Sequence, residues 1–181
     1  NEEFCSLIAD KIHLDVPLHI MVSDNSERRK SKSCKCMIKP LNLPLQSFMK
    51  VGKVCLSEEI NIYMASPEMC FMQAAKYLDF YDLIRLGTDL CAIYIFDAES
   101  RYSERSRRPI VNAEMIRTYV DLAGAFSGSK NARCASKYIQ DNSNSPAETW
   151  IAMLSVLPYS NGGYALPFPQ LNGEVLLSKE A

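Results

Sequence analysis

The segment from Ser145 to Pro158, SPAETWIAMLSVLP, constrains the fold of this chain most strongly. A serine followed by a proline and, three residues after the serine, by a glutamate is typical of a capped helix N-terminus. The residues that follow are mostly apolar. The pair Gly162-Gly163 then predicts a turn, and LPFPQLNGEVLL (residues 166–177) predicts a strand. We therefore expect a helix, a turn and a strand in succession.

The size of the chain allows one large domain or two small ones. Its 181 residues are 48% hydrophobic and 23% charged, which is typical of a globular protein with a buried core. A formal net charge of −1 argues against binding nucleic acid by bulk charge, and leaves local basic patches as the route to such binding. The acidic start of the chain and the short apolar runs predict no signal peptide and no membrane contact. We expect a cytoplasmic protein.

The seven cysteines do not form a zinc-binding pattern. Only Cys34 and Cys36 are close together, as C-x-C, and a second pair at zinc-ligand spacing is missing. Most of the others lie inside apolar runs, where a free cysteine acts as a small hydrophobic residue. We expect reduced thiols, no metal site and no cofactor within this chain.

The order of patterns predicts an α+β fold, in which a small β-rich N-terminal layer packs with several helices and the chain ends in a helix–strand unit. Phe4 to Ile12 is compatible with a short leading helix. Strands are expected at residues 18–22, 34–39, 48–51 and 60–64. Helices are expected from the cap Ser66 to Leu78, from Asp79 or Phe80 to Phe96, from the cap Asn112 to Leu122, and over residues 130–141 with Ala132, Cys134, Ala135 and Tyr138 facing inward.

Residues 97–109 are expected to form a polar loop, and Asp141 to Ser145 a hinge. This hinge divides the chain into two expected domains, residues 1–141 and residues 142–181.

Glu148 is the candidate catalytic residue. Its local pattern alone favours a capping box, in which Ser145 caps the helix and the glutamate reaches back to the backbone N–H of the cap. However, Ser-Pro-x-Glu-Thr at the start of an apolar helix, followed by a loop and a strand, resembles the beginning of endonuclease domains related to the very-short-patch repair nucleases, which have the PD-(D/E)xK fold. The resemblance implies that Glu148 points toward a metal site. Trp150, two residues later, is expected in the core.

The remaining residues of such a nuclease site are not present in this sequence. After Glu148 the acids are Glu174 and Glu180, and Lys179 precedes the second of them. Phosphodiester hydrolysis needs Mg²⁺ held by two or more carboxylates, with a lysine near the attacking water. We therefore expect no catalysis from this chain alone. Either the parent protein continues past Ala181, with Mg²⁺ bound by a complete domain, or the segment is a remnant.

A second resemblance covers the region from Leu18 to Leu171. A strand, then Ser-Pro opening a helix, then Leu-x-x-Leu-Gly, is similar to the C-terminal domain of AbiEi-type antitoxins, which in several members precedes the nuclease-like domain. The matching residues are Ser66, Pro67, Glu68, Cys70, Phe71, Leu83, Leu86 and Gly87. Such relatives often begin with a winged-helix DNA-binding domain. Residues 1–16 are too short to form one, so promoter binding is not implied.

Two clusters of basic residues are candidates for nucleic-acid binding. The first surrounds an expected hairpin between the first two strands, and the second lies in the polar loop. The candidate residues are Arg28, Arg29, Lys30, Lys32, Arg105, Arg107 and Arg108. Phosphate contacts from these groups give sequence-independent, salt-sensitive binding, and solvated loops are the alternative. No aromatic residue is interleaved with the clusters, which argues against a platform for single strands.

These observations lead to two hypotheses. The first is a regulatory or recognition module of a defence-associated or toxin–antitoxin-related protein, which in full-length relatives precedes a metal-dependent endonuclease domain, with DNA or a protein such as a toxin or a second copy as its partner. The second is a protein-interaction module with no catalysis and no nucleic-acid contact.

Overall fold

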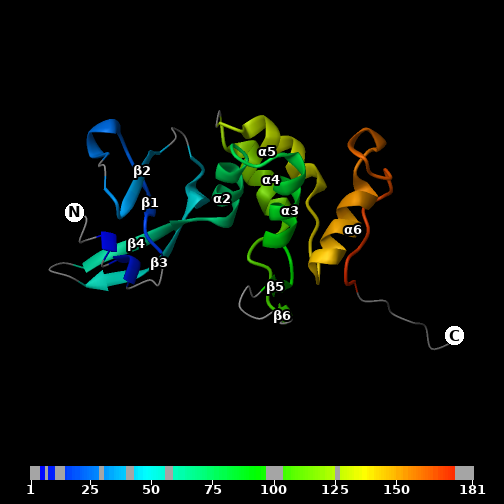
Figure 1. Ribbon diagram of the computed structural model, residues 1–181, viewed down its shortest axis with the longest axis horizontal. Coiled ribbons are helices and arrows are strands. Elements are labelled where there is room, and N and C mark those ends of the chain that lie inside the picture. The colour runs from blue at the N-terminus through cyan, green and yellow to red at the C-terminus, as the bar shows by residue number, and fades with distance from the viewer. Residues whose placement is uncertain are drawn as a thin grey trace. The chain divides into compact units, whose positions relative to one another are not determined.

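The computed structural model describes residues 5–6, 8–10, 15–28, 31–39, 43–55, 59–96, 104–124 and 127–173, with the backbone alone at 54–55, 60, 95–96 and 104–106. The chain forms two compact units, residues 1–64 and residues 65–181, which we call unit 1 and unit 2. Helices and short strands occur together, and the fold is α+β as expected (Figure 1).

Unit 1 contains strands and short 3₁₀ turns. The elements are β1 (Leu18–Val22), η1 (Asn25–Glu27), β2 (Cys34–Ile38), η2 (Leu45–Ser47), β3 (Phe48–Cys55) and β4 (Glu59–Ala65), whose last residue is the first of unit 2. β1 pairs with β2, and β3 pairs with β4. The predicted strands are confirmed, and β3 is longer than expected. Residues 5, 6 and 8–10, which are the described part of the expected leading helix, are helical.

The expected hairpin between β1 and β2 is wrong, because the two strands run parallel with Leu18 opposite Cys34 and Val22 opposite Ile38. The turn residues do form a turn. Asp24 accepts a hydrogen bond from the backbone N–H of Ser26 at 2.6 Å and caps η1. The residues directly after this turn do not pair with β1. The chain first runs back to the start of β1, where the N–H of Leu18 donates to the carbonyl of Ser33, and β2 begins there. A tight turn alone therefore did not reveal the strand direction.

Unit 2 is built mainly from helices. They are α2 (Pro67–Ala74), α3 (Phe80–Leu90), α4 (Ala113–Leu122), α5 (Ser129–Ala135), η3 (Ser136–Tyr138), α6 (Pro146–Val156) and η4 (Tyr159–Asn161), and β5 (Tyr94–Phe96) pairs antiparallel with β6 (Glu104–Ser106) after α3. Side-chain N-caps start α2, α3, α4 and α6. The caps are Ser66, Asp79, Asn112 and Ser145, each accepting from the backbone three residues later.

The core of unit 2 lies among α2, α3, α4 and α5, with α6 packed on α3 (Figure 1). Its largest fully buried side chains include Phe71, Tyr119 and Ile139. Gly87 lies in the middle of α3 at the closest approach of these elements. A Cβ at this position would lie 2.6 Å from Cγ1 of Ile139 and 3.1 Å from Cε2 of Phe71. The glycine therefore allows close packing inside the helix.

Three expected helices are shorter than predicted. The helix expected to close at Leu78 ends at Ala74. The next helix begins at Phe80 as expected but ends at Leu90, and β5 follows within the predicted range. Its end is fixed by partners far away in sequence, because the N–H of Ile93 donates to the carbonyl of Ser143 and the N–H of Arg107 donates to the carbonyl of Ile93. The helix expected to reach Asp141 changes into η3 at Ser136. Cys134, expected to face inward, is exposed.

Residues 97–109 also depart from the expectation of a polar loop, because they include β6. The strand forms by pairing with β5, with Tyr94 opposite Ser106. A short polar strand of this kind depends on its partner more than on its own sequence.

The segment after α6 does not form the expected strand in its described part, residues 166–173. Pro167 and Pro169 have no N–H to donate to a ladder. The chain instead folds back on the end of α6. The N–H groups of Tyr164 and Leu166 donate to carbonyls in the last turn of α6, and that of Ala165 donates to the carbonyl of the C-cap residue Leu157. Residues 174–177 of the expected strand lie outside the described residues.

The expected hinge at Asp141 to Ser145 is an ordered connection. Ser143 is fully buried, and Asp141 accepts a hydrogen bond from the N–H of Ala113 at 2.8 Å, at the start of α4. Residues 142–173 therefore belong to the same compact unit as the preceding helices. The expected division into an antitoxin-like domain, residues 1–141, and a nuclease-like segment, residues 142–181, rests on the two sequence resemblances and stays a prediction. In the part of the chain that the structure describes, no helix is long and apolar enough to cross a membrane.

Candidate functional site

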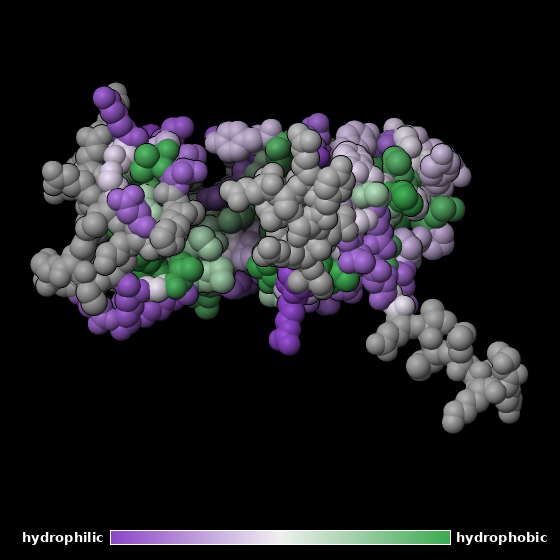
Figure 2. Space-filling view, turned by 60° about the horizontal axis from the view of Figure 1, so that its bottom comes forward, coloured by the Kyte–Doolittle hydropathy of each residue, from purple (hydrophilic) through white to green (hydrophobic). Residues whose placement is uncertain are grey.

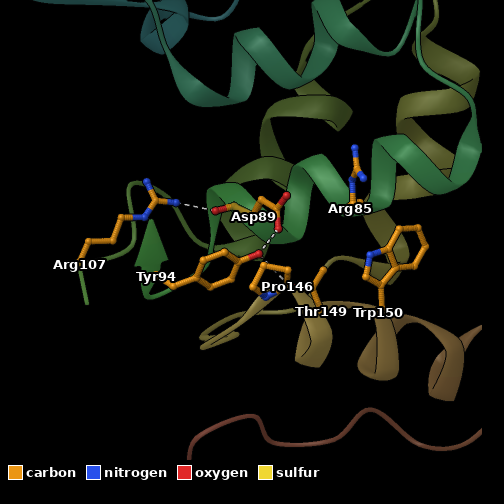
Figure 3. Close-up of a pocket in the computed structure, with 7 residues that line it drawn as sticks. All are labelled: Arg85, Asp89, Tyr94, Arg107, Pro146, Thr149 and Trp150. Carbon is orange, nitrogen blue, oxygen red and sulfur yellow. Dashed lines mark hydrogen bonds between the residues drawn. The ribbon is translucent and has the colours of Figure 1, made fainter. Parts of the chain in front are cut away.

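A cavity of about 380 Å³ lies between α3, β5 and α6 of unit 2 (Figure 3). Its lining residues come from four separate stretches of the chain. They are Arg85, Asp89, Tyr94, Arg107, Pro146, Thr149 and Trp150. We call this cavity the arginine–tryptophan pocket.

Helix periodicity explains how most of these residues meet. Arg85 and Asp89 are four residues apart on α3 and so lie on one face of that helix. Pro146 lies three residues before Thr149 and four before Trp150, which places these residues near one another at the start of α6. The capping hydrogen bond from the N–H of Glu148 to Oγ of Ser145 (3.2 Å) fixes the start of α6, and with it the place of these three residues.

The floor of the pocket is a buried chain of hydroxyl groups. The Tyr94 hydroxyl donates to Oδ1 of Asp89 at 2.6 Å and lies 3.5 Å from Oγ1 of Thr149 (Figure 3). Oγ1 of Thr149 is in turn 2.8 Å from Oγ of Ser143. Tyr94 is 5% exposed, Thr149 1% and Ser143 0%. Buried hydrogen-bonded side chains of this kind hold a single geometry, so the pocket is preorganised.

Two arginines give the pocket its positive charge. Arg107 is half-buried, and its Nη2 donates to the main-chain carbonyl of Asp89 at 2.5 Å. Its Nε is buried without an acceptor among the residues that the structure describes. The guanidinium of Arg85 lies over the Trp150 ring, 5.8 Å from the ring centroid, and is 3.4 Å from Oδ1 of Asp82. Two arginines and one carboxylate line the pocket, and the Asp82 carboxylate beside Arg85 offsets a further positive charge.

Glu148 does not line this pocket. Its Oε2 accepts from the N–H of Asn144 at 2.6 Å, one residue before the position expected in a capping box. Nδ2 of Asn172 donates to both carboxylate oxygens, at 3.1 Å from Oε1 and 2.9 Å from Oε2. The carboxylate therefore joins the start of α6 to the segment that follows it. Within the described ranges, no group of three His, Cys, Asp or Glu side chains is arranged to hold a metal ion.

The basic residues predicted from sequence are divided between the two units. Arg107 lines the arginine–tryptophan pocket, and Arg108 beside it is exposed. Arg28 and Lys32 are exposed residues of unit 1. Arg29, Lys30 and the side chain of Arg105 lie outside what the structure describes.

A second cavity, of about 460 Å³, lies between residues 139–142, which lead toward α6, and residues 168–171. Its arginine, Arg117, already donates to the carbonyls of Ser136 (3.1 Å) and Ile139 (2.9 Å). These bonds give Arg117 a structural role. The arginine–tryptophan pocket is therefore the better candidate for binding a charged ligand.

Sequence reasoning found Arg107 but missed its neighbours. Trp150, expected in the core, is 40% exposed at the pocket. Arg85, Asp89 and Tyr94 were not singled out. Their four-residue spacing on α3 placed Arg85 and Asp89 together on one face, and no local pattern indicated that Tyr94 and α6 would meet that face.

The fold and the pocket define an α+β protein with an arginine- and aromatic-lined cavity in its helical unit. Comparison of the chain with protein-family models, with curated proteins and with solved structures finds no match.

Proposed function

We propose that this chain is a regulatory or recognition module of a cytoplasmic defence-associated or toxin–antitoxin-related protein, placed ahead of a metal-dependent endonuclease domain in which α6 is the first helix. Glu148 would be the first metal-site carboxylate of that domain. The proposal starts from the two resemblances in sequence, around Ser66 and around Ser145, in the order expected for such proteins.

The observation that carries the proposal is the second apolar face of α6. One face, which includes Ala152, Met153 and Val156, is buried in unit 2. Two apolar residues next to this buried set face outward, because Ile151 is 67% and Leu154 41% exposed. Apolar surface gathers at the α6 end of unit 2 (Figure 2). A helix that is apolar all round is normally covered on both sides, and the remainder of a nuclease domain would supply the second cover.

The alternative is a protein-interaction module with no catalysis and no nucleic-acid contact. One observation favours it specifically. The Glu148 carboxylate already accepts hydrogen bonds from Asn144 and Asn172, so a metal ion would have to displace the Asn172 side chain. In this alternative the exposed face of α6 binds another protein.

The deciding experiment uses the protein extended along its reading frame beyond Ala181. We expect an Asp and a (D/E)-x-K motif in the next domain-sized stretch, and Mg²⁺-dependent cleavage of DNA that Glu148→Gln abolishes. Glu114→Gln is the matched control, since Glu114 is also an acidic residue in the first turn of a helix, α4.

Two results would refute the nuclease proposal. One is an extension without these acids and lysine. The other is cleavage that Glu148→Gln and Glu114→Gln leave equally unchanged. A chain that captures a protein partner through α6, and loses it with Ile151→Asp, would then support the alternative.

A further inference from the structure

We propose that the arginine–tryptophan pocket binds a nucleotide, with the base at Trp150 and the phosphate at Arg107. The chemistry is that of an aromatic ring joined to an oxyanion, supplied either by a free mononucleotide or by an unpaired nucleotide of a single strand. The inference deepens the proposed recognition role and rests on that role only for the choice between these two sources.

The ring site is formed by Trp150 and Arg85. Trp150 is 40% exposed, which leaves part of the indole accessible. The Arg85 guanidinium lies over one face of the ring, 5.8 Å from the ring centroid, and leaves the exposed part of the indole for a base to stack on. Every nucleobase presents a flat aromatic face, and stacking on a tryptophan contributes about 1–3 kcal/mol per base without dependence on sequence.

The phosphate site is formed by Arg107. Its hydrogen bond to the carbonyl of Asp89 fixes the guanidinium at the pocket, and its Nε has no acceptor among the described residues. The Nε is closed to solvent in this conformation, so a phosphate oxygen reaches it only when the Arg107 side chain shifts. A buried charged donor without a partner is costly, and a phosphate oxygen is a strong acceptor that can offset that cost. The Asp89 carboxylate keeps its negative charge while it accepts from the Tyr94 hydroxyl, and so opposes part of this attraction.

The size and polarity of the pocket agree with such a ligand. A volume of about 380 Å³ is at the lower end of small-molecule sites. The buried hydroxyls of Thr149 and Ser143 below it keep the walls in place. A nucleotide, with one ring and one charged group, meets both features of the lining, whereas inorganic phosphate meets only the second.

Trp150 is the only tryptophan of the chain, so its fluorescence reports on this pocket directly. The intact chain is titrated at low salt with AMP, with an oligothymidylate, with a duplex of the same length and with inorganic phosphate. We expect saturable quenching by the oligothymidylate, weaker quenching by the duplex, and the weakest response to phosphate. Binding of AMP as tight as that of the oligonucleotide identifies a free nucleotide as the ligand.

Neighbouring arginines provide a matched pair of variants. We expect Arg107→Ala to raise the Kd at least about tenfold, because a charge-assisted hydrogen bond is lost, and Arg108→Ala, outside the pocket, to change it by less than about twofold. Because Arg107 also holds the main chain at Asp89, Arg85→Ala serves as a second variant that removes no described main-chain hydrogen bond. It should weaken binding of the oligonucleotide or of AMP and leave the thermal unfolding temperature unchanged.

Three results would overturn the inference. The first is no saturable change in fluorescence with either AMP or the oligonucleotide. The second is equal weakening by Arg107→Ala and Arg108→Ala, which would indicate binding by surface charge. The third is inorganic phosphate binding as tightly as both nucleotide ligands, which would leave no role for Trp150. None of these results depends on nuclease activity, so failure of this inference and failure of the nuclease proposal are separate outcomes.

Discussion

At the scale of single residues, helix caps are the clearest determinants of this fold. Ser145 accepts from the N–H of Glu148 at 3.2 Å, and Asn112 accepts from the N–H of Met115 at 2.8 Å. We expect Ser145→Ala and Asn112→Ala each to lower the free energy of unfolding by about 1 kcal/mol, because each leaves a first-turn N–H without its acceptor. Urea unfolding followed by circular dichroism measures the loss.

The caps also allow a check on Glu148. Glu148→Gln removes a negative charge from a helix N-terminus and should cost about 0.5 kcal/mol. Ser160→Ala, at an exposed serine in η4, is the control and should be silent. If Ser145→Ala costs no more than Ser160→Ala, the cap does not contribute to stability.

The thiols should differ sharply in reactivity. Cys91 is 0% exposed, and burial, with the Asp141 carboxylate nearby, raises the pKa of its thiol. An ordinary thiol has a pKa of about 8.5 and forms a reactive thiolate above that pH, whereas the Cys91 thiol stays protonated there. Cys134 is exposed. We expect a maleimide to modify Cys134 in the native chain and Cys91 only after unfolding, as measured by peptide mass spectrometry. Modification of both at similar rates would contradict this placement.

At the scale of elements, Gly87 is required by the packing of α3 and not by its backbone conformation. An alanine in a helix interior normally adds about 1 kcal/mol of stability over glycine. Here its Cβ would lie 2.6 Å from Cγ1 of Ile139, and Ile139 is 0% exposed. We expect Gly87→Ala to lower the free energy of unfolding by about 1–3 kcal/mol through overpacking.

A double-mutant cycle with Ile139→Ala identifies the cause. The double variant should be more stable than the sum of the single losses predicts, by about 1 kcal/mol, because the new methyl group fills part of the space that Ile139 leaves. Gly52→Ala, where a Cβ would meet nothing within 4 Å, is the control. A simple additive result would show that the two positions do not compete for space.

The same elements show what could be predicted from the sequence and why. The starts of α2, α3, α4 and α6 were correct, because a cap and the first turn lie within a few residues of each other. The end of α3 was wrong because it depends on Ser143 and Arg107, which are distant in sequence. The strand expected after α6 was wrong because Pro167 and Pro169 outweigh the apolar pattern in its described part.

For the candidate site, the chemistry of one residue was predictable and the arrangement was not. The basic segment pointed to Arg107, yet the ring beside it belongs to Trp150 on α6. The basic clusters themselves indicated no stacking platform, and local sequence therefore argued against a stacking site. Pockets assembled from several helices depend on tertiary packing, which periodicity within one segment cannot show.

At the scale of the whole molecule, the place of α6 decides where the chain can be divided. α6 packs on α3 and buries Ala152, Met153 and Val156 within unit 2. A fragment of residues 65–181 retains all of these contacts, and one of residues 65–141 exposes the apolar surface beneath α6. We expect the longer fragment to unfold cooperatively and the shorter one to be less stable by roughly 4 kcal/mol, the contribution of burying about two large apolar side chains. Thermal unfolding followed by circular dichroism compares them. Equal stability would show that α6 is only an attached helix, and that the boundary expected at residue 141 also divides the fold.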